Sequence, residues 1–247
     1  MICLVLAGGF AVRMHPLTEN TPKALLCINK KTILSYIMED LCKNPELEKI
    51  ILLTNNKFYS LFEQWIEASD LPKEIILFNN GMNRPEENCG VIESVVQVIQ
   101  TFDVTDDFLI IGGDNLLSFP IRRFLDFYYE SRQSCVMWYQ EDELERLQRT
   151  GVAVVKKDKV EKMQEKPQVP IGNCAIPPIY IYSAEAIKQI NECLNSECKT
   201  NSPGDLLEWL VSRTTIRAMK MPGCRYDVGN LQNYYQLEND STKHYYI

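Results

Sequence analysis

A glycine pair and two cations near the N-terminus are the first residues whose types and spacing suggest chemistry. Gly8 and Gly9 follow the apolar run 2–7, and Arg13 and Lys23 come after them. Glycines at the end of a buried strand let backbone N–H groups approach an anion closely. A guanidinium offers a planar fork for phosphate oxygens, and an ammonium offers a mobile point charge. Each feature alone is more often a turn or a surface cation, but their ordered combination is typical of a phosphate-binding loop.

A carboxylate follows a second apolar run. Residues 108–111 are followed by the sequence Gly112-Gly113-Asp114-Asn115. If this run is a strand, Asp114 lies at its carboxyl end, where open α/β sheets bind their ligands. A Gly-Asp pair after a strand is usually only a turn, so Asp114 is a candidate site residue that needs support from other motifs.

Alternating strands and helices must position these residues. In the first half, short apolar runs predict strands and segments of helical period predict helices, which together favour a mainly parallel sheet covered on both faces. The second half is more mixed, and no internal repeat or linker divides the chain. We therefore expect one α/β domain over residues 1–247, whose sheet gains some antiparallel strands. The predicted strands are 2–7, 50–54, 74–78, 108–111, 134–139, 151–155, 179–182 and 215–219, and the predicted helices are 33–43, 58–69, 91–102, 184–193 and 205–211.

Composition excludes several classes of protein. The formal charge is −7 and no block of basic residues stands out, so we expect no nucleic-acid partner. No apolar run is long enough to span a bilayer, and the N-terminus has no secretory signal. The nine cysteines are scattered and odd in number, which predicts reduced thiols in a cytoplasmic protein. With only two histidines, a histidine-rich zinc site is excluded.

The opening stretch resembles the signature loop of the sugar-1-phosphate nucleotidylyltransferases, whose pattern is L-A-G-G-x-G-T-R-L-x-P-L-T followed by P-K-x-L. This chain has LAGGFAVRMHPLT at 6–18 and PKALL at 22–26, with Ala11 in place of glycine and Val12 in place of threonine. The resemblance implies that Arg13 stabilises the pyrophosphate leaving group and that Lys23 clamps the nucleotide phosphates. By the same resemblance, the expected catalytic residues are Arg13, Lys23 and Asp114. The nucleotide-binding residues it implies are Ala7, Gly8, Gly9, Arg13, Lys23 and Gly90, the last of which begins a helix under the nucleobase.

Two further motifs resemble the metal site of the same family. The Gly-Asp-Asn sequence that ends at Asn115 matches one of them, and Tyr226-Asp227-Val228-Gly229-Asn230 resembles the other. The resemblance makes Asp114 and Asp227 the two protein ligands of one Mg²⁺. Two carboxylates completed by phosphate oxygens and water suit this ion.

A third group of motifs marks the acceptor side. Glu165-Lys166-Pro167 resembles the family's E-K-P element, in which the lysine binds the sugar phosphate and the glutamate contacts sugar hydroxyls. Gly151 matches a glycine that lets the sugar approach the backbone, and Asn173 belongs to an element resembling N-x-A. Pro177-Pro178 departs from the family, which has a glycine here, and stiffens this edge of the pocket. The resemblance therefore does not identify the sugar.

The resemblance covers residues 1 to about 237. It implies a three-layer, nucleotide-diphospho-sugar transferase-like α/β fold with a mainly parallel, mixed sheet, a nucleotide-binding half at about 1–115 and an acceptor half at about 116–237. It also implies a Mg²⁺-dependent enzyme, similar to a glucose-1-phosphate thymidylyltransferase, that joins dTTP, UTP or CTP to a sugar 1-phosphate. One alternative is a phosphocholine cytidylyltransferase, for which Trp138, Tyr139 and Tyr180 would form an aromatic cage. The other is a catalytically inactive homologue that binds a sugar nucleotide. The base, the sugar, the pathway and any self-association into a homo-oligomer stay open.

Overall fold

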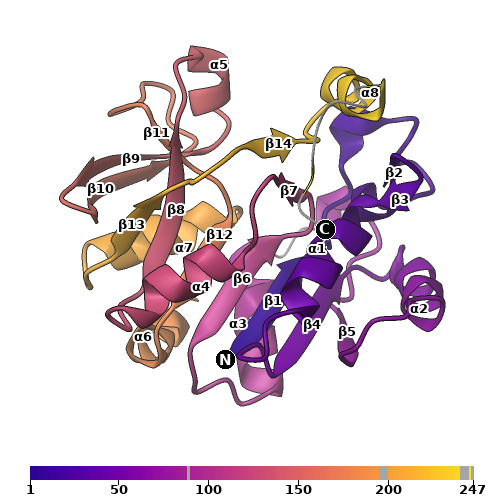
Figure 1. Cartoon of the computed structure of the whole chain (residues 1–247), viewed down its shortest axis with the longest axis horizontal. Coiled ribbons are helices and arrows are strands. Elements are labelled where there is room, and N and C mark those ends of the chain that lie inside the picture. Colours follow the sequence, from indigo (N-terminus) through magenta and orange to yellow (C-terminus); the bar gives the residue numbers. More distant parts are fainter. Residues whose placement is uncertain (88–89, 195–199, 240–244, 246–247) are drawn as a thin grey trace. The chain divides into compact units, whose positions relative to one another are not determined.

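The computed structural model describes residues 1–87, 90–194, 200–239 and 245 (Figure 1). The chain divides into two compact units that are interleaved along the sequence. Unit 1 comprises Met1–Asn88, Ile111–Arg123 and Pro222–Ile247, and unit 2 comprises Cys89–Ile110 and Phe124–Met221. Unit 1 thus takes in both ends of the chain. The expected single domain, with halves that meet near residue 115, stays a prediction.

The core of unit 1 is parallel sheet. Strand β1 (Ile2–Leu6) pairs with β4 (Lys49–Thr54), which pairs in turn with β5 (Ile75–Asn79). These strands lie side by side in Figure 1. Five successive residues of β4 are buried, as expected of a strand that is covered on both faces. The continuous apolar runs therefore predicted these strands to within a residue or two.

Two helices of unit 1 also match the expected segments. These are α1 (Ile33–Cys42) and α2 (Tyr59–Glu67). Thr32 begins α1, because its hydroxyl accepts a hydrogen bond from the backbone N–H of Ser35 at 3.1 Å. One face of α1 is apolar and buried, and includes Ile33 and Ile37.

Short elements of unit 1 were not predicted. A two-stranded ribbon joins β7 (Asn115–Leu117) to β14 (Arg225–Asp227), and a second ribbon joins β2 (Cys27–Ile28) to β3 (Lys31–Thr32). Helix α8 (Leu231–Asn239) follows β14. Short 3₁₀ turns lie at Val12–Met14, Lys23–Leu25 and Pro85–Glu87.

The sheet of unit 2 is mostly antiparallel. Strand β9 pairs antiparallel with β10 and β11, β8 pairs antiparallel with β11 and β12, and β10 pairs antiparallel with β13, whereas β8 and β13 are parallel. Lys157 and Asp158 join β9 to β10 in a two-residue turn in which both have positive φ, as type I′ hairpin turns require. The predicted α/β class with a mixed sheet is confirmed. The strands of unit 2 are β8 (Cys135–Gln140), β9 (Gly151–Lys156), β10 (Lys159–Glu165), β11 (Cys174–Ile176), β12 (Ile179–Tyr182) and β13 (Arg217–Lys220).

Helices α3, α6 and α7 of this part of the chain were predicted, and α4 and α5 were not. Strand β6 (Phe108–Gly112) runs across the boundary between the two units along the chain, and its last residue leads into the Gly-Asp motif. The helices are α3 (Val91–Thr101), α4 (Arg122–Tyr129), α5 (Leu144–Leu147), α6 (Ala184–Leu194) and α7 (Pro203–Val211).

Among the described residues, no helix is long and apolar enough to cross a membrane. The cysteines differ from the expectation at one position. Cys193 is disulfide-bonded. The expectation that every cysteine is reduced is therefore wrong at Cys193. Free thiols are present at Cys3, Cys27, Cys42, Cys135, Cys174 and Cys224.

Asp40 of α1 fixes the chain that leaves β7. Its Oδ2 accepts a hydrogen bond from the backbone N–H of Ile121 at 2.8 Å, and its side chain is buried. Burial raises the pKa of Asp40 to about 6, against the opposing effects of that hydrogen bond and of Lys43. The helix and the ribbon are thus held together by a buried carboxylate whose charged form is disfavoured.

We expect Asp40 to make the protein less stable as the pH rises. Its pKa is about 6 when folded against an ordinary value of 3.8, so its contribution to the free energy of unfolding falls as the pH rises through this range and stays lost at neutral pH. Asp40→Asn keeps an oxygen acceptor for Ile121 and removes the buried charge. It should raise the free energy of unfolding near neutral pH by about 1–3 kcal/mol and have less effect in acid. Urea unfolding at acidic and neutral pH measures this, with the exposed Asp70→Asn as control. An equal effect of Asp40→Asn at both pH values would contradict it.

Candidate active site

The glycine loop follows β1 and is anchored to the ends of neighbouring strands. The N–H of Ala7 donates to the carbonyl of Leu53 at 2.9 Å, and Asn55 Nδ2 donates to the carbonyl of Gly8 at 3.0 Å. A Cβ atom on Gly8 would lie 3.2 Å from a methyl group of Leu53, so a larger residue would crowd the end of β4. Gly9, in contrast, is exposed with open space around it. The loop is therefore held at one end while Gly9 stays accessible.

The substitution of Ala11 for the family's glycine falls at a left-handed backbone position. Ala11 has φ 47° and ψ 41°, a region that glycine adopts without cost and alanine does not. Thr18 helps to hold this conformation, since its hydroxyl donates to the carbonyl of Ala11 at 2.8 Å. The 3₁₀ turn after Ala11 carries Arg13, whose side chain is exposed and forms no ion pair with the described residues. The loop thus keeps the geometry of a glycine loop and presents a guanidinium to solvent.

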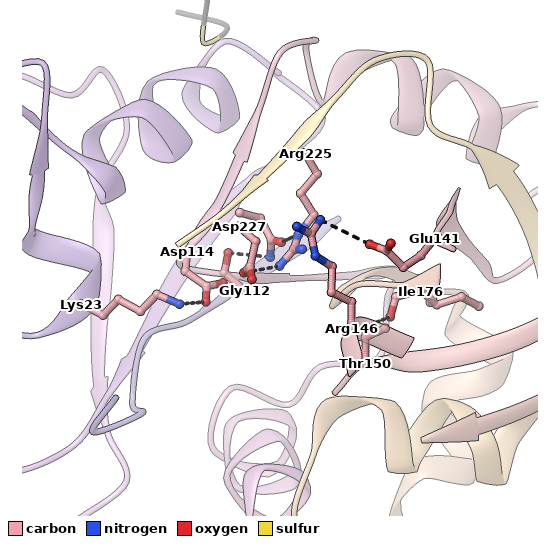
Figure 2. A network of polar contacts seen from close by, with 10 residues as sticks. Lys23, Gly112, Asp114, Glu141, Arg146, Thr150, Ile176, Arg225 and Asp227 are labelled. Carbon is pink, nitrogen blue, oxygen red and sulfur yellow. Dashed lines mark hydrogen bonds and ion pairs between the residues drawn. The ribbon is translucent and has the colours of Figure 1, made fainter. Parts of the chain in front are cut away.

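Lys23 and Asp114 form an ion pair. Lys23 Nζ lies 2.5 Å from Asp114 Oδ2, and Figure 2 shows the lysine reaching the carboxylate. Burial raises the pKa of Asp114, but attraction to Lys23 and to Arg225 outweighs it, so the pKa of this carboxyl lies below its ordinary value. Asp114 is therefore a carboxylate at neutral pH. The structure brings together two of the three predicted catalytic residues.

The ribbon of β7 and β14 brings the two predicted metal ligands together. In its antiparallel register Asn115 lies opposite Asp227, and Asp114 directly precedes Asn115 in the chain. Opposite residues of such a pair have Cα atoms about 4.5–5.5 Å apart. A Cβ atom on Gly229 would lie 2.7 Å from Asp227 Oδ2, so the glycine leaves room for the carboxylate. Two aspartates far apart in sequence therefore occupy neighbouring places in unit 1.

Arg225 is a residue of this site that the sequence analysis missed. Its Nε donates to Asn115 Oδ1 at 2.5 Å, and its Nη2 lies 3.2 Å from Asp227 Oδ1 (Figure 2). The spacing of Arg225 and Asp227 could have revealed it. Residues two apart on a strand share a face, so Arg225 lies beside Asp227 if this segment is a strand. The two carboxylates thus each have a cationic partner.

The donor set of this site fits Mg²⁺. Carboxylate oxygens are the ligands that this ion prefers, and one or two of them usually hold it together with substrate phosphates. The side chain of Asp227 is 48% exposed, so an ion can reach it from solvent. Both carboxylates also pair with cationic side chains, which a metal ion would have to displace in part.

Three of the four predicted acceptor residues meet on one hairpin of unit 2. Glu165 on β10 lies opposite Gly151 on β9, and the backbone N–H of Lys166 donates to the carbonyl of Thr150 at 3.1 Å. Lys166 has φ 47°, Nζ 3.6 Å from Glu165 Oε1, and a hydrogen bond to the hydroxyl of Ser202. The hairpin therefore holds Gly151, Glu165 and Lys166 together.

Glu165 lies in a niche that two glycines leave open. A Cβ atom on Gly204, at the start of α7, would overlap the Glu165 carboxylate, and one on Gly151 would lie 3.0 Å from it. Burial raises the pKa of Glu165 to about 6, opposed by Lys166 and reinforced by Asp205. Glu165 is thus mainly ionised at neutral pH and near its titration point in mild acid.

Two predicted residues lie outside these clusters. Asn173 precedes β11, and its amide donates to Asp142 Oδ1 at 3.3 Å, while the next residue pairs with Ala153 rather than with Gly151. Gly90 begins α3 with φ 87°, where a Cβ atom would lie 2.6 Å from the carbonyl oxygen of Thr200. The positive φ and the close approach of the Thr200 backbone account for a glycine here, and its contact with a base stays a prediction.

The three aromatic residues of the alternative acceptor site do not gather into a cage. Trp138 and Tyr139 are consecutive on β8 and so point to opposite faces of the sheet. Tyr180 is 2% exposed, and Tyr139 packs against a small cluster that includes Leu147. These positions fit aromatic residues that pack in and around the sheet better than a cage that binds choline.

Comparison with known proteins agrees with this geometry. The profile of the nucleotidyl transferase family matches residues 2–244, so the chain belongs to this family. Its relatives are sugar-1-phosphate nucleotidylyltransferases, which confirms the resemblance seen in the opening loop. A UTP–glucose-1-phosphate uridylyltransferase, AglF of Haloferax volcanii, is 24% identical over 93% of this chain and 91% of its own length. A glucose-1-phosphate adenylyltransferase of Mycoplasma mobile is 23% identical over 99% of this chain and 68% of its own length.

Solved structures show the fold. A UDP-glucose pyrophosphorylase complexed with UDP-glucose superposes with a TM-score of 0.80 at 21% identity, over 97% of this chain and 98% of that one. The predicted nucleotide-diphospho-sugar transferase-like fold is therefore confirmed. The chain spans only 61% and 51% of the length of two further relatives, from Sulfolobus acidocaldarius and Methanocaldococcus jannaschii.

Proposed function

We propose that this chain is a Mg²⁺-dependent nucleotidyltransferase that joins a nucleoside triphosphate to a sugar 1-phosphate and releases pyrophosphate. The observation that carries the proposal is the meeting of Lys23, Asp114 and Asp227 in unit 1. A family member that had lost catalysis would have no need to keep both carboxylates and the cations of the loop. We assign the nucleotide phosphates and the metal to the residues of unit 1, and the acceptor to the hairpin residues of unit 2.

The proposed reaction needs positioning and charge neutralisation rather than a general base. An oxygen of the sugar phosphate attacks the α-phosphorus, and the bond to pyrophosphate breaks. The nucleophile is already an anion, so no side chain has to accept its proton. Arg13 and Lys23 hold the nucleotide phosphates and neutralise the charge that develops on the leaving group, and Lys166 holds the acceptor phosphate.

Asp114 and Asp227 would hold the Mg²⁺. When bound, the ion would neutralise phosphate charge in the transition state. The exposed Arg13 suits its role, because a guanidinium that forms no ion pair with the described residues is available to an incoming phosphate. To bind the nucleotide, Lys23 has to leave the carboxylate of Asp114 and contact phosphate oxygens instead.

The substrates are proposed only as a class. We expect the base to come from dTTP, UTP or CTP, and glucose 1-phosphate is the first acceptor to test. The cytoplasmic location predicted from composition, and self-association, also stay predictions. A substrate matrix of each nucleotide with several sugar 1-phosphates and with phosphocholine, measured as pyrophosphate release, tests the proposal. Release with CTP and phosphocholine alone would contradict the sugar assignment.

Lys166→Ala is expected to raise the KM for the sugar 1-phosphate at least about tenfold and to change the KM for the nucleotide little. The physical reason is that a dianion brought beside a triphosphate needs a cation of its own, and a hydrogen-bonded charge pair is worth about 1.5–3 kcal/mol. Steady-state kinetics with each substrate varied in turn measure both constants.

The matched control for Lys166→Ala is Lys162→Ala, which removes the same charge from an exposed position on β10, the strand that ends just before Lys166. Equal changes in both variants, or a rise only in the nucleotide KM of Lys166→Ala, would refute the assignment of Lys166 to the acceptor.

A further inference from the structure

Arg225 is a mostly buried cation beside the predicted metal ligands, and the family motifs do not account for it. Its side chain is 13% exposed. The guanidinium contacts both strands of the ribbon, through Nε to Asn115 Oδ1 and through Nη2 to Asp227 Oδ1. Figure 2 shows Arg225 beside Asp227. It therefore bridges the strand that carries Asp227 and the turn that carries Asp114.

The ribbon explains why these three side chains meet. Arg225 and Asp227 are two apart on β14 and share a face, and Asn115 lies opposite Asp227 on β7. Arg225 reaches Asn115 along the diagonal of the ribbon, a spacing that long side chains cover. The amide of Asn115 donates in turn to the carbonyl of Gly112 at 3.1 Å, so this buried amide links the guanidinium to the turn before Asp114.

The charges of this group cancel. Lys23 faces Asp114 and Arg225 faces Asp227, so two carboxylates are matched by two cations. A divalent ion that enters must compete with both internal ion pairs, because each cation repels it and occupies an oxygen that it would bind. Asp227 is the more exposed of the two carboxylates, at 48% against 31% for Asp114, so its pair with Arg225 is the one that solvent and ions reach more easily.

We propose that Arg225 acts as an internal competitor of the metal ion, which holds Asp227 by an ion pair until metal and nucleotide bind together. The inference rests on the proposed function in taking Asp227 as a metal ligand. The nucleotide removes the competition, because its phosphate oxygens give the displaced guanidinium and the Lys23 ammonium new anionic partners. Arg225 is thus a positioning residue that makes metal binding depend on the nucleotide.

Mn²⁺ binding in the absence of nucleotide tests this exchange. We expect Arg225→Gln to bind Mn²⁺ about tenfold more tightly than the wild type, because Asp227 loses its competing partner. Arg225→Lys keeps the cation and loses the two-point contact, and should tighten binding by a smaller factor, about threefold. Titration of free Mn²⁺ by electron paramagnetic resonance gives the affinity, and circular dichroism confirms the fold of each variant. If the glutamine variant does not fold, the lysine variant carries the test.

The matched control is Arg122→Gln. Arg122 lies in unit 1 and pairs with Glu46 at 2.6 Å, so its replacement removes the same charge from another ion pair. Unchanged Mn²⁺ affinity in both Arg225 variants, or equal tightening in Arg122→Gln, would overturn the proposal. So would the absence of Mn²⁺ binding from every protein, which would remove the metal site as well. The test uses neither acceptor nor turnover, so failure of the substrate matrix alone would leave this inference standing.

Discussion

Asp114→Ala and Asp227→Ala are each expected to lower kcat by about a hundredfold to a thousandfold or more while the protein stays folded. Each variant removes half of the protein ligands proposed for the metal and takes the paired carboxylate from a cation. In Asp114→Ala this cation is Lys23, whose side chain is 16% exposed and can reach water by a change of rotamer. The loss should therefore appear in turnover far more than in folding. Pyrophosphate release gives the rate, and thermal unfolding gives the stability.

The exposed Asp70→Ala is the control for both variants, because it removes a carboxylate of unit 1 that has no place in the proposed site. It should retain wild-type turnover. Full activity in Asp114→Ala or in Asp227→Ala, or undiminished wild-type activity in excess EDTA, would refute the metal site. Loss of folding in all three proteins would point to a general effect of charge removal.

Arg13→Ala is expected to lower kcat by about a hundredfold to a thousandfold, the usual effect of removing one electrostatic partner of a transition state. Arg13 forms no ion pair with the described residues and is exposed, so its removal should leave the free energy of unfolding nearly unchanged. Arg13→Lys should restore activity only in part, because an ammonium lacks the planar fork that meets two phosphate oxygens. Single-turnover measurement of pyrophosphate release isolates this step.

Arg84→Ala serves as the control for Arg13, since its side chain is 75% exposed and pairs with a neighbouring glutamate on the surface. A normal kcat for Arg13→Ala would mean that the opening loop has only a structural role. Loss of activity in Arg84→Ala to the same extent would show that the assay responds to net charge rather than to the loop.

The inactive-homologue alternative is tested by the same measurements. Loss of a metal aspartate or of the loop arginine would favour it, and the chain keeps Arg13, Asp114 and Asp227. Nucleotide binding without pyrophosphate release in any combination of the substrate matrix would support this alternative over the proposed enzyme.

Local sequence determined the strands and helices that carry a continuous signal. The runs that became β1 and β4 are apolar and buried over most of their length, and α1 shows a clear helical period with a threonine cap. The glycine loop could also be predicted from local sequence. Gly8 acts through its backbone and Arg13 through its charge, and the two residues lie close together in the chain. Such features need no information about distant parts of the chain.

Only the tertiary structure decided the rest of the candidate site. The ribbon that joins Asp227 to Asn115 is three residues long on each strand and pairs segments about 110 positions apart, so neither strand has a period of its own. Buried and exposed residues do not alternate regularly along β10, because its register with β9 shifts between Val160 and Lys162. The sequence analysis therefore missed the strand that ends at Glu165. The sequence by itself supplied the chemical groups. Their partners, such as Arg225 for Asp227, follow from strand pairing between distant segments, because such pairing depends on long-range burial and hydrogen bonding that a local window of sequence does not contain.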